Sequence, residues 1–222
     1  MQTRPDSRYL AELNERLFAH FVGGAWRAPL SDRLLPVTGA AGAALGRIVC
    51  AGARDIARAR GVLRQGPDPD AIDADALWAA MLAEAPLLRT IRAQEGFTDD
   101  QLTAPAPLTP AGRGPLVLLT AADTPLDRIA GALLAGAGRG MIWKPAPAAA
   151  ASAHLLMRAV GPLARGRLAL LQGDHATGAL LAGQEAAQES GQGGLIWAGA
   201  GPLPEGLPTP LVNLAATDPC RP

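Results

Sequence analysis

Short apolar runs alternate with helical stretches in the second half of the chain, and this alternation constrains the fold most. The runs are uniformly apolar: PLVLL (115–119), GMIW (140–143), RLALL (167–171), GLIW (194–197) and PLVNL (210–214). The stretches between the first four, 124–137, 148–163 and 176–189, have helical character. Continuous apolar strands separated by helices are typical of a parallel sheet covered on both faces. Because crossovers are right-handed, we predict an α/β fold, a Rossmann-like doubly wound parallel sheet with helices on both faces.

The first half of the chain has a different pattern. Residues 8–19 place leucines at helical spacing and predict a leading helix, and residues 53–65 and 74–94 predict a helical pair. Between them, glycine-rich turns separate the apolar runs of 21–29 and 34–52 and predict a β-hairpin or flap. We therefore divide the chain into an N-terminal helical and hairpin part (1–102), a proline-rich connector (103–114) and a Rossmann-like domain (115–222).

Composition argues against several kinds of partner. The chain has 222 residues, 20 Lys plus Arg and 20 Asp plus Glu, and no net charge. A neutral chain has no overall field to attract nucleic acid or an anionic membrane, so neither is expected as a partner. We find no secretory signal and no apolar stretch long enough to span a membrane, and we expect a cytoplasmic protein.

Metal binding is not expected either. Two cysteines, Cys50 and Cys220, cannot form a four-thiolate site, and the three histidines have no partner ligands at metal-binding spacing. Those histidines are His20, His154 and His175. His175 follows a strand end. It either lines a ligand crevice at that edge of the sheet or, as we favour, lies in a surface loop. Cys50 is expected to be a small buried hydrophobe.

A collinear set of motifs resembles the aldehyde dehydrogenase superfamily. The segments VGGAW (22–26), PVTG (36–39) and the acidic helix start at Asp55 are similar to the family's opening strand, turn and helix. Residues 115–147 resemble its strand, Asn-Phe-Pro-Leu turn, Ala/Gly-rich helix and Lys-Pro-Ser-Glu strand end. LALLQGD (168–174), GLIWAGAG (194–201) and PLVNLAATDP (210–219) resemble three later segments. The resemblance implies the family's fold without its catalytic domain.

The same resemblance implies three catalytic groups, and none of them is at its place. The oxyanion-holding asparagine falls on Asp123, whose carboxylate would repel a developing oxyanion. Asp123 precedes Thr124-Pro125 at a helix start, so we favour a capping role over a new acid, with the Thr124 hydroxyl also at the cap. The general-base glutamate falls on Asn213, which cannot take a proton. Because the family's nucleophile lies well beyond that position, Cys220 is not its counterpart, and we expect a catalytically degenerate chain.

Cofactor binding is also in question. Lys144 matches the lysine that contacts the adenosine ribose, but Pro147 replaces the accompanying glutamate. Lys144 is therefore either a vestigial ribose ligand or a solvated cation at a strand end. Gly199 matches a position before the family's phosphate-facing helix, but the link 199–213 is too proline-rich to form that helix. We expect no bound cofactor, with NAD as the alternative.

Three functional hypotheses follow. The chain resembles the C-terminal pseudo-domain of the aldehyde dehydrogenase 16 group, and also the C-terminal module of long bifunctional proline-catabolic enzymes. This resemblance implies a pseudoenzyme subunit that self-associates, or assembles with an active NAD(P)-dependent aldehyde dehydrogenase and stabilises or regulates it. The alternative is an NAD-binding subunit of an aldehyde dehydrogenase whose nucleophilic cysteine comes from another chain. The third hypothesis is a degraded gene product without a selected role.

Overall fold

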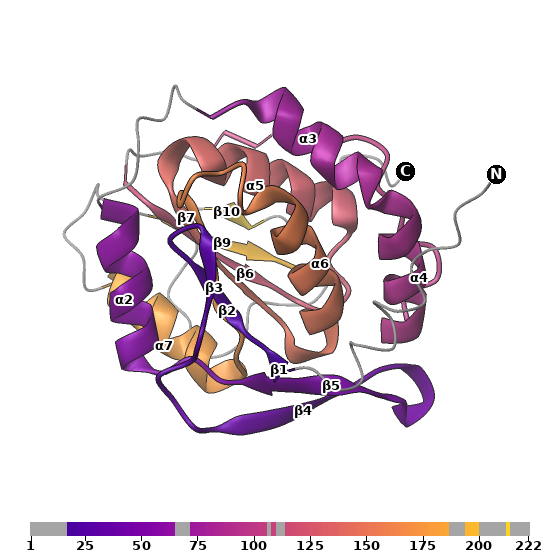
Figure 1. Cartoon of the computed structure of the whole chain (residues 1–222), viewed down its shortest axis with the longest axis horizontal. Helices are drawn as coiled ribbons and strands as arrows, with labels where there is room; N and C mark the ends of the chain where they lie inside the picture. Colours follow the sequence, from indigo (N-terminus) through magenta and orange to yellow (C-terminus); the bar gives the residue numbers. More distant parts are fainter. Residues whose placement is uncertain are drawn as a thin grey trace.

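A seven-stranded sheet forms the centre of the molecule, with helices on both faces (Figure 1). The computed structural model describes residues 17–64, 72–105, 108–109, 114–186, 194–199 and 212–213. The strand order is β10-β9-β6-β7-β8-β2-β3. The five strands from the second half of the chain pair with one another in parallel. They are β6 (Leu116–Thr120), β7 (Met141–Pro145), β8 (Leu168–Leu170), β9 (Gly194–Ala198) and β10 (Val212–Asn213). The predicted parallel sheet is confirmed.

Helices cover the two faces of this sheet. On one face α5 (Leu126–Arg139) and α6 (Ala150–Val160), preceded by the short η3 (Pro147–Ala149), pack on side chains such as Leu118 and Trp143. On the other face α2 (Ala53–Arg64) and α7 (His175–Ala186) pack on side chains such as Leu119 and Trp197. Because β6 to β8 run one way across the sheet and β9 returns to the far side of β6, the sheet is doubly wound as predicted.

Two further helices form an outer layer over α5 and α6. They are α3 (Ala74–Ala83) and α4 (Ala85–Glu95), where the sequence predicted one continuous helix. The break lies at Glu84, and Pro86 occupies the first turn of α4. Proline has no backbone N–H to continue the preceding helix, but it is well tolerated in a first turn. Gly96, with a φ of 102°, ends α4 in the left-handed region.

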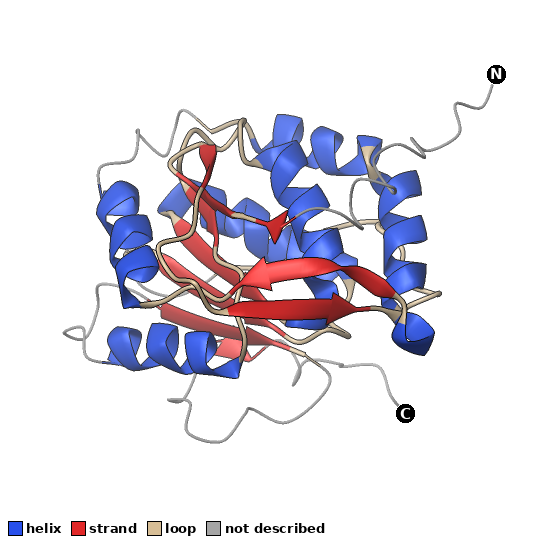
Figure 2. Cartoon of the chain, turned by 60° about the horizontal axis from the view of Figure 1, so that its bottom comes forward, coloured by secondary structure: helices blue, strands red, loops and turns tan. Residues whose placement is uncertain are grey.

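The predicted hairpin or flap proves to be two hairpins in two sheets. The first, β2 (His20–Val22) and β3 (Ala25–Arg27), turns at Gly23 and Gly24, whose φ angles are 66° and 77°. It joins the main sheet through an antiparallel pairing of β2 with β8. The second, β4 (Leu34–Thr38), η1 (Ala40–Gly42) and β5 (Ala44–Val49), belongs to a smaller sheet of order β1-β5-β4 (Figure 2).

The predicted leading helix is wrong where it can be assessed. Residues 1–16 lie outside the described part, and β1 (Leu17–Phe18) is a strand parallel to β5. Phe18 is fully buried and pairs with Ile48, so the tertiary partner decides the local conformation. None of the described helices is long and apolar enough to cross a membrane.

Candidate functional site

The carboxyl ends of β6, β7 and β9 meet at one edge of the main sheet. Thr120 pairs with Pro145 on one side and with Ala198 on the other. Ligands of open α/β sheets bind at such an edge, where the strand order reverses beside β6. The structure brings Asp123, Lys144 and Gly199 to this edge, and Asn213 lies in β10 opposite Trp197. We call this region the crevice.

Asp123 does not cap helix α5. The N-cap residue of α5 is Pro125, and the Leu126 N–H donates to Asp100 Oδ1 at 2.9 Å. The Thr124 hydroxyl donates instead to the Ala198 carbonyl at 2.7 Å, which ties the turn after β6 to the end of β9. Both capping predictions are therefore wrong, because a carboxylate distant in sequence already occupies the helix start. Asp123 remains exposed.

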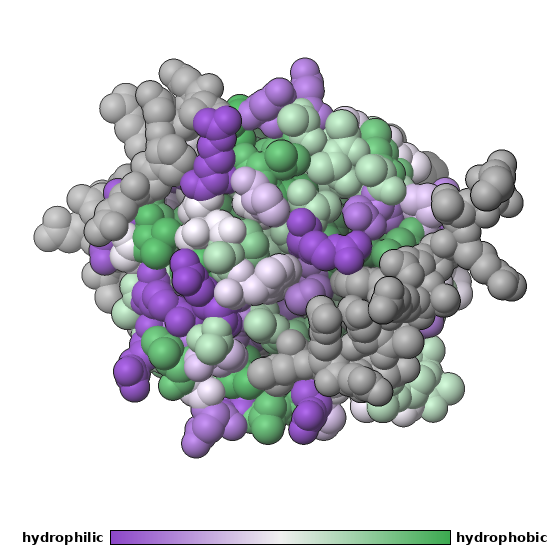
Figure 3. All heavy atoms as spheres, viewed as in Figure 1, coloured by the Kyte–Doolittle hydropathy of each residue, from purple (hydrophilic) through white to green (hydrophobic). Residues whose placement is uncertain are grey.

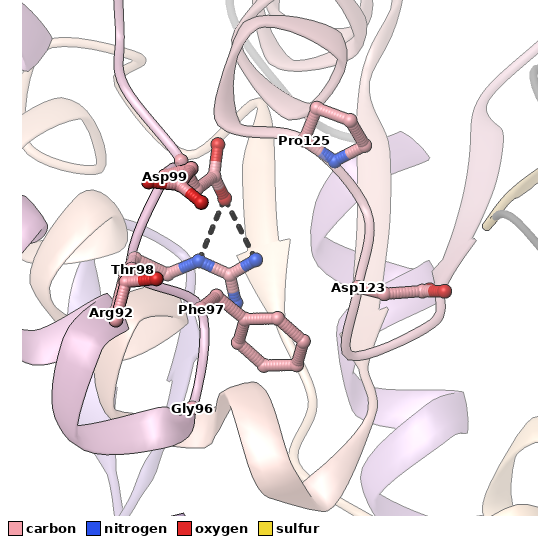
Figure 4. A pocket seen from close by; sticks show the side chains of 8 residues that line it. Arg92, Gly96, Phe97, Thr98, Asp99, Asp123 and Pro125 are labelled. Carbon is pink, nitrogen blue, oxygen red and sulfur yellow. Dashed lines mark hydrogen bonds and ion pairs between the residues drawn. The ribbon is translucent and has the colours of Figure 1, made fainter.

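A pocket of about 390 Å³ lies beside Asp123 (Figure 4). Phe97, Thr98, Asp99 and Pro125 are among the residues that line it. In Figure 4 the Asp123 side chain points away from the Arg92 guanidinium, and the Phe97 ring lies next to that guanidinium. The oxyanion position of the resemblance thus carries a solvent-facing carboxylate.

Arg92 forms a buried network under this pocket that the sequence did not reveal. Its side chain is 1% exposed, and its Nε donates to Asp100 Oδ2 at 2.8 Å. Further N–H groups donate to Glu95 Oε2 at 3.3 Å and to the Ala122 carbonyl at 2.9 Å. The guanidinium also lies over the Phe97 ring, 4.2 Å from its centroid. Arg92 therefore ties α4 to the turn between β6 and α5.

Glu95 extends this network to α6. Its Oε1 accepts a hydrogen bond from the Ser152 N–H at 2.9 Å, in the first turn of α6. Burial raises the pKa of Glu95, and the contacts with Ser152 and Arg92 act in the opposite direction. An i,i+3 pair of Arg92 and Glu95 was readable in the sequence, but its burial was not.

Lys144 is buried rather than solvated, so that alternative interpretation is wrong. Its residue is 7% exposed, on the face of the sheet that α2 and α7 cover. A Cβ on Gly178 would lie 4.0 Å from Lys144 Nζ, so the first turns of α7 pass directly over the lysine. Burial lowers the pKa of Lys144 to about 8, and the Asp174 carboxylate raises it in part. Among the described residues, the ammonium has ionic attraction to Asp174 but no hydrogen-bond acceptor.

Asp174, which lies between β8 and α7, belongs to a second group of charged residues near the crevice. One of its oxygens accepts a hydrogen bond from the Thr177 N–H at 3.1 Å, which caps α7. Both oxygens also bind the Arg33 guanidinium, through Nη1 and, at 2.8 Å, through Nη2. The Arg33 hydrogen bond is the main reason why the pKa of Asp174 falls to about 2. Because these residues lie 141 positions apart, no local pattern predicted the pair.

Three helices that begin near this edge thus receive a carboxylate from the chain itself. Asp100 binds the start of α5, Glu95 that of α6 and Asp174 that of α7. Helix N-termini are the usual places for the phosphates of a nucleotide, because their N–H groups and dipole attract anions. The three carboxylates occupy N–H groups that would otherwise donate to a pyrophosphate. At these described helix N-termini, the residues present do not fit a dinucleotide.

Gly199 has a packing requirement of its own. A Cβ at this position would lie 2.6 Å from the Ala121 Cβ and 3.1 Å from the Trp197 ring, so any larger residue would force β9 and the turn after β6 apart. Whether Gly199 also contacts a cofactor stays a prediction. The expected loss of the phosphate-facing helix falls on residues 200–211, which lie outside the described part.

The histidines do not gather. His20 is buried in β2, where its Nδ1 accepts from the Gln172 N–H at 3.2 Å, and burial lowers its pKa to about 4. The His154 ring stacks on Trp26 with centroids 4.1 Å apart, and His175 is exposed at the start of α7. Within the described ranges, no group of three or more His, Cys, Asp and Glu side chains is arranged to hold a metal ion. As predicted, Cys50 is buried.

The fold is that of aldehyde dehydrogenases. An aldehyde dehydrogenase from Bartonella henselae matches with a TM-score of 0.64 and 16% identity, over 82% of this chain and 52% of that one. The Delta-pyrroline-5-carboxylate dehydrogenase from Mycobacterium tuberculosis matches with a TM-score of 0.63 and 19% identity, over 88% and 45%. Aldehyde dehydrogenase C from Pseudomonas syringae, solved as a mutant with NAD+ and octanal, gives 0.59 and 17%, over 84% and 50%.

This chain therefore spans about half the length of the solved structures that it matches. That partial coverage agrees with the expectation that the catalytic domain has no counterpart in this sequence. No protein-family model matches the chain, and no curated protein matches it by sequence. The shared fold, rather than sequence identity, is what connects this chain to aldehyde dehydrogenases.

Proposed function

We propose that the chain is an aldehyde-dehydrogenase-like pseudoenzyme subunit that assembles with an active NAD(P)-dependent aldehyde dehydrogenase and stabilises or regulates it. The supporting observation is the charge at the crevice. Carboxylates occupy the starts of α5, α6 and α7, and Asp123 presents another where the resemblance places an oxyanion donor. Helix starts that are already occupied oppose a cofactor pyrophosphate, and the exposed Asp123 carboxylate opposes a developing oxyanion.

The proposal has further parts. We place the protein in the cytoplasm and expect neither nucleic acid nor membrane as a partner, because the chain carries no net charge. The division at 1–102, 103–114 and 115–222 stays a prediction, although β2 and β3 of the first part extend the sheet of the last. Self-association of this chain is the second form of assembly that the proposal includes.

Assembly is tested by co-purification followed by reconstitution. A tagged chain, expressed in its native host, is expected to bring down an aldehyde dehydrogenase in stoichiometric amount. The two purified proteins are then expected to co-elute in size-exclusion chromatography, with a change in the melting temperature or activity of the dehydrogenase. A chain that stays monomeric, with no dehydrogenase in the eluate and none bound on mixing, would contradict the proposal.

One observation favours the alternative, an NAD-binding subunit of an aldehyde dehydrogenase whose nucleophilic cysteine comes from another chain. Lys144 keeps a buried place at the crevice although its burial disfavours the ammonium form. The two functions differ in a fluorescence titration of NADH. We expect no saturable signal with the wild type. A saturable signal that disappears in Lys144→Ala, in a variant that still unfolds cooperatively, would establish the alternative and contradict the proposal that the crevice holds no cofactor.

A further inference from the structure

One carboxylate, Asp174, serves two cations and a helix start at the crevice. It binds Arg33 through both oxygens, accepts the Thr177 N–H and lies close enough to Lys144 to raise the pKa of the ammonium. Arg33 precedes β4, Lys144 lies in β7 and Asp174 follows β8, so three separate segments converge here. With one negative charge against two positive ones, the cluster keeps an excess positive charge.

We propose that Asp174 is a built-in anion that keeps external anions out of the site formed by Lys144, Arg33 and the start of α7. The inference goes beyond assembly with a dehydrogenase and does not depend on it. In this view the crevice retains an anion site, and the chain fills that site itself. A phosphate group binds at Lys144 and Arg33 only when it displaces the Asp174 carboxylate.

The proposal rests on the geometry of the two cations. Lys144 is only 7% exposed, and its ammonium has no hydrogen-bond acceptor among the described residues. Its N–H donors are therefore available to an anion. Arg33 is half exposed and presents a planar fork that matches carboxylate and phosphate oxygens alike. Helix α7 adds its N-terminal N–H groups, which favour negative charge at the same place. Among the described residues, Asp174 is the carboxylate that stands among these groups, and the buried Cys50 thiol also raises the pKa of both cations in part.

The test compares Asp174→Asn with Asp73→Asn. Asparagine caps helices about as well as aspartate, so both variants are expected to keep their helix starts. Asp73 caps α3 through the Ala76 N–H at 3.0 Å and is a matched control at another helix. Inorganic phosphate and ADP are the two probes, and they separate a site for the anion alone from one that also takes a nucleoside. Binding is followed through the NMR signal of 13C-labelled lysine, because Lys144 is the chain's one lysine.

Removal of the built-in anion is expected to raise phosphate or ADP affinity by about tenfold or more in Asp174→Asn, which corresponds to about 1.4 kcal/mol. Wild type and Asp73→Asn should show no comparable shift of the Lys144 signal. In Asp174→Asn combined with Arg33→Gln the gain should be lost again, because one of the two cations is missing. Wild-type binding as tight as that of Asp174→Asn would overturn the proposal, and so would no gain in a folded Asp174→Asn. Co-elution with a dehydrogenase is measured separately, so the two proposals fail independently.

Discussion

Replacement of Arg92 by methionine is expected to lower the free energy of unfolding by about 3–5 kcal/mol, the usual cost of removing one partner from a buried ion pair. Arg92 is almost completely buried and binds two carboxylates and two backbone carbonyls. Methionine fills similar space but leaves Glu95 buried without its cation. The change therefore removes the connection of α4 with the turn between β6 and α5. Chemical denaturation followed by circular dichroism measures the effect.

Arg158→Met is the matched control for this prediction. Arg158 forms an ion pair with Glu84 at 3.4 Å, and its side chain is 40% exposed. Exposed pairs contribute little, so this change is expected to cost less than about 1 kcal/mol. Because Arg92 and Glu95 are coupled, Arg92→Met combined with Glu95→Gln should cost less than the two single changes added together. Equal stability of Arg92→Met and Arg158→Met would show that the network does not stabilise the fold.

The sequence predicted those parts of the fold in which local pattern and tertiary environment agree. The strands β6, β7 and β9 are mostly apolar because both of their faces are covered, and this property is visible residue by residue. The strand β1 differs, because two residues carry no period and only the pairing of Phe18 with Ile48 defines them. The sequence therefore predicted the long apolar strands, but it could not predict β1, which is a strand only because it pairs with β5.

The candidate site shows the same difference between features set by local sequence and features set by long-range packing. The position of Lys144 at a strand end followed from the pattern of β7, but its burial depends on Gly178 in α7. The cap of α5 was assigned to Asp123 or Thr124, next to the helix in sequence, whereas the structure supplies Asp100 from the segment after α4. Pairs such as Arg33 with Asp174 join segments far apart in the chain. Such contacts depend on the packed fold and leave no local signal.

Lys144→Met is expected to stabilise the protein by about 3 kcal/mol at pH 7, since each unit of pKa shift corresponds to about 1.4 kcal/mol. Burial lowers the pKa of this lysine from 10.5 to about 8 in the folded chain. Between those two values the unfolded chain holds the proton and the folded chain does not, so wild-type stability rises as the pH increases from 8 to 10.5. Below pH 8 the wild type bears the full cost of a buried ammonium.

The advantage of Lys144→Met should therefore shrink as the pH rises toward 10.5, and denaturation at a series of pH values measures it. Lys144→Arg is the control: it keeps a charge throughout this range and should show neither the stabilisation nor the convergence. Constant destabilisation by methionine at every pH would mean that Asp174 fully compensates the ammonium. A lysine that costs stability, with its amine close to the start of α7, is the kind of group that proteins keep for a site rather than for the fold. Stabilisation in Lys144→Met would thus support an anion site at the crevice, held closed by Asp174.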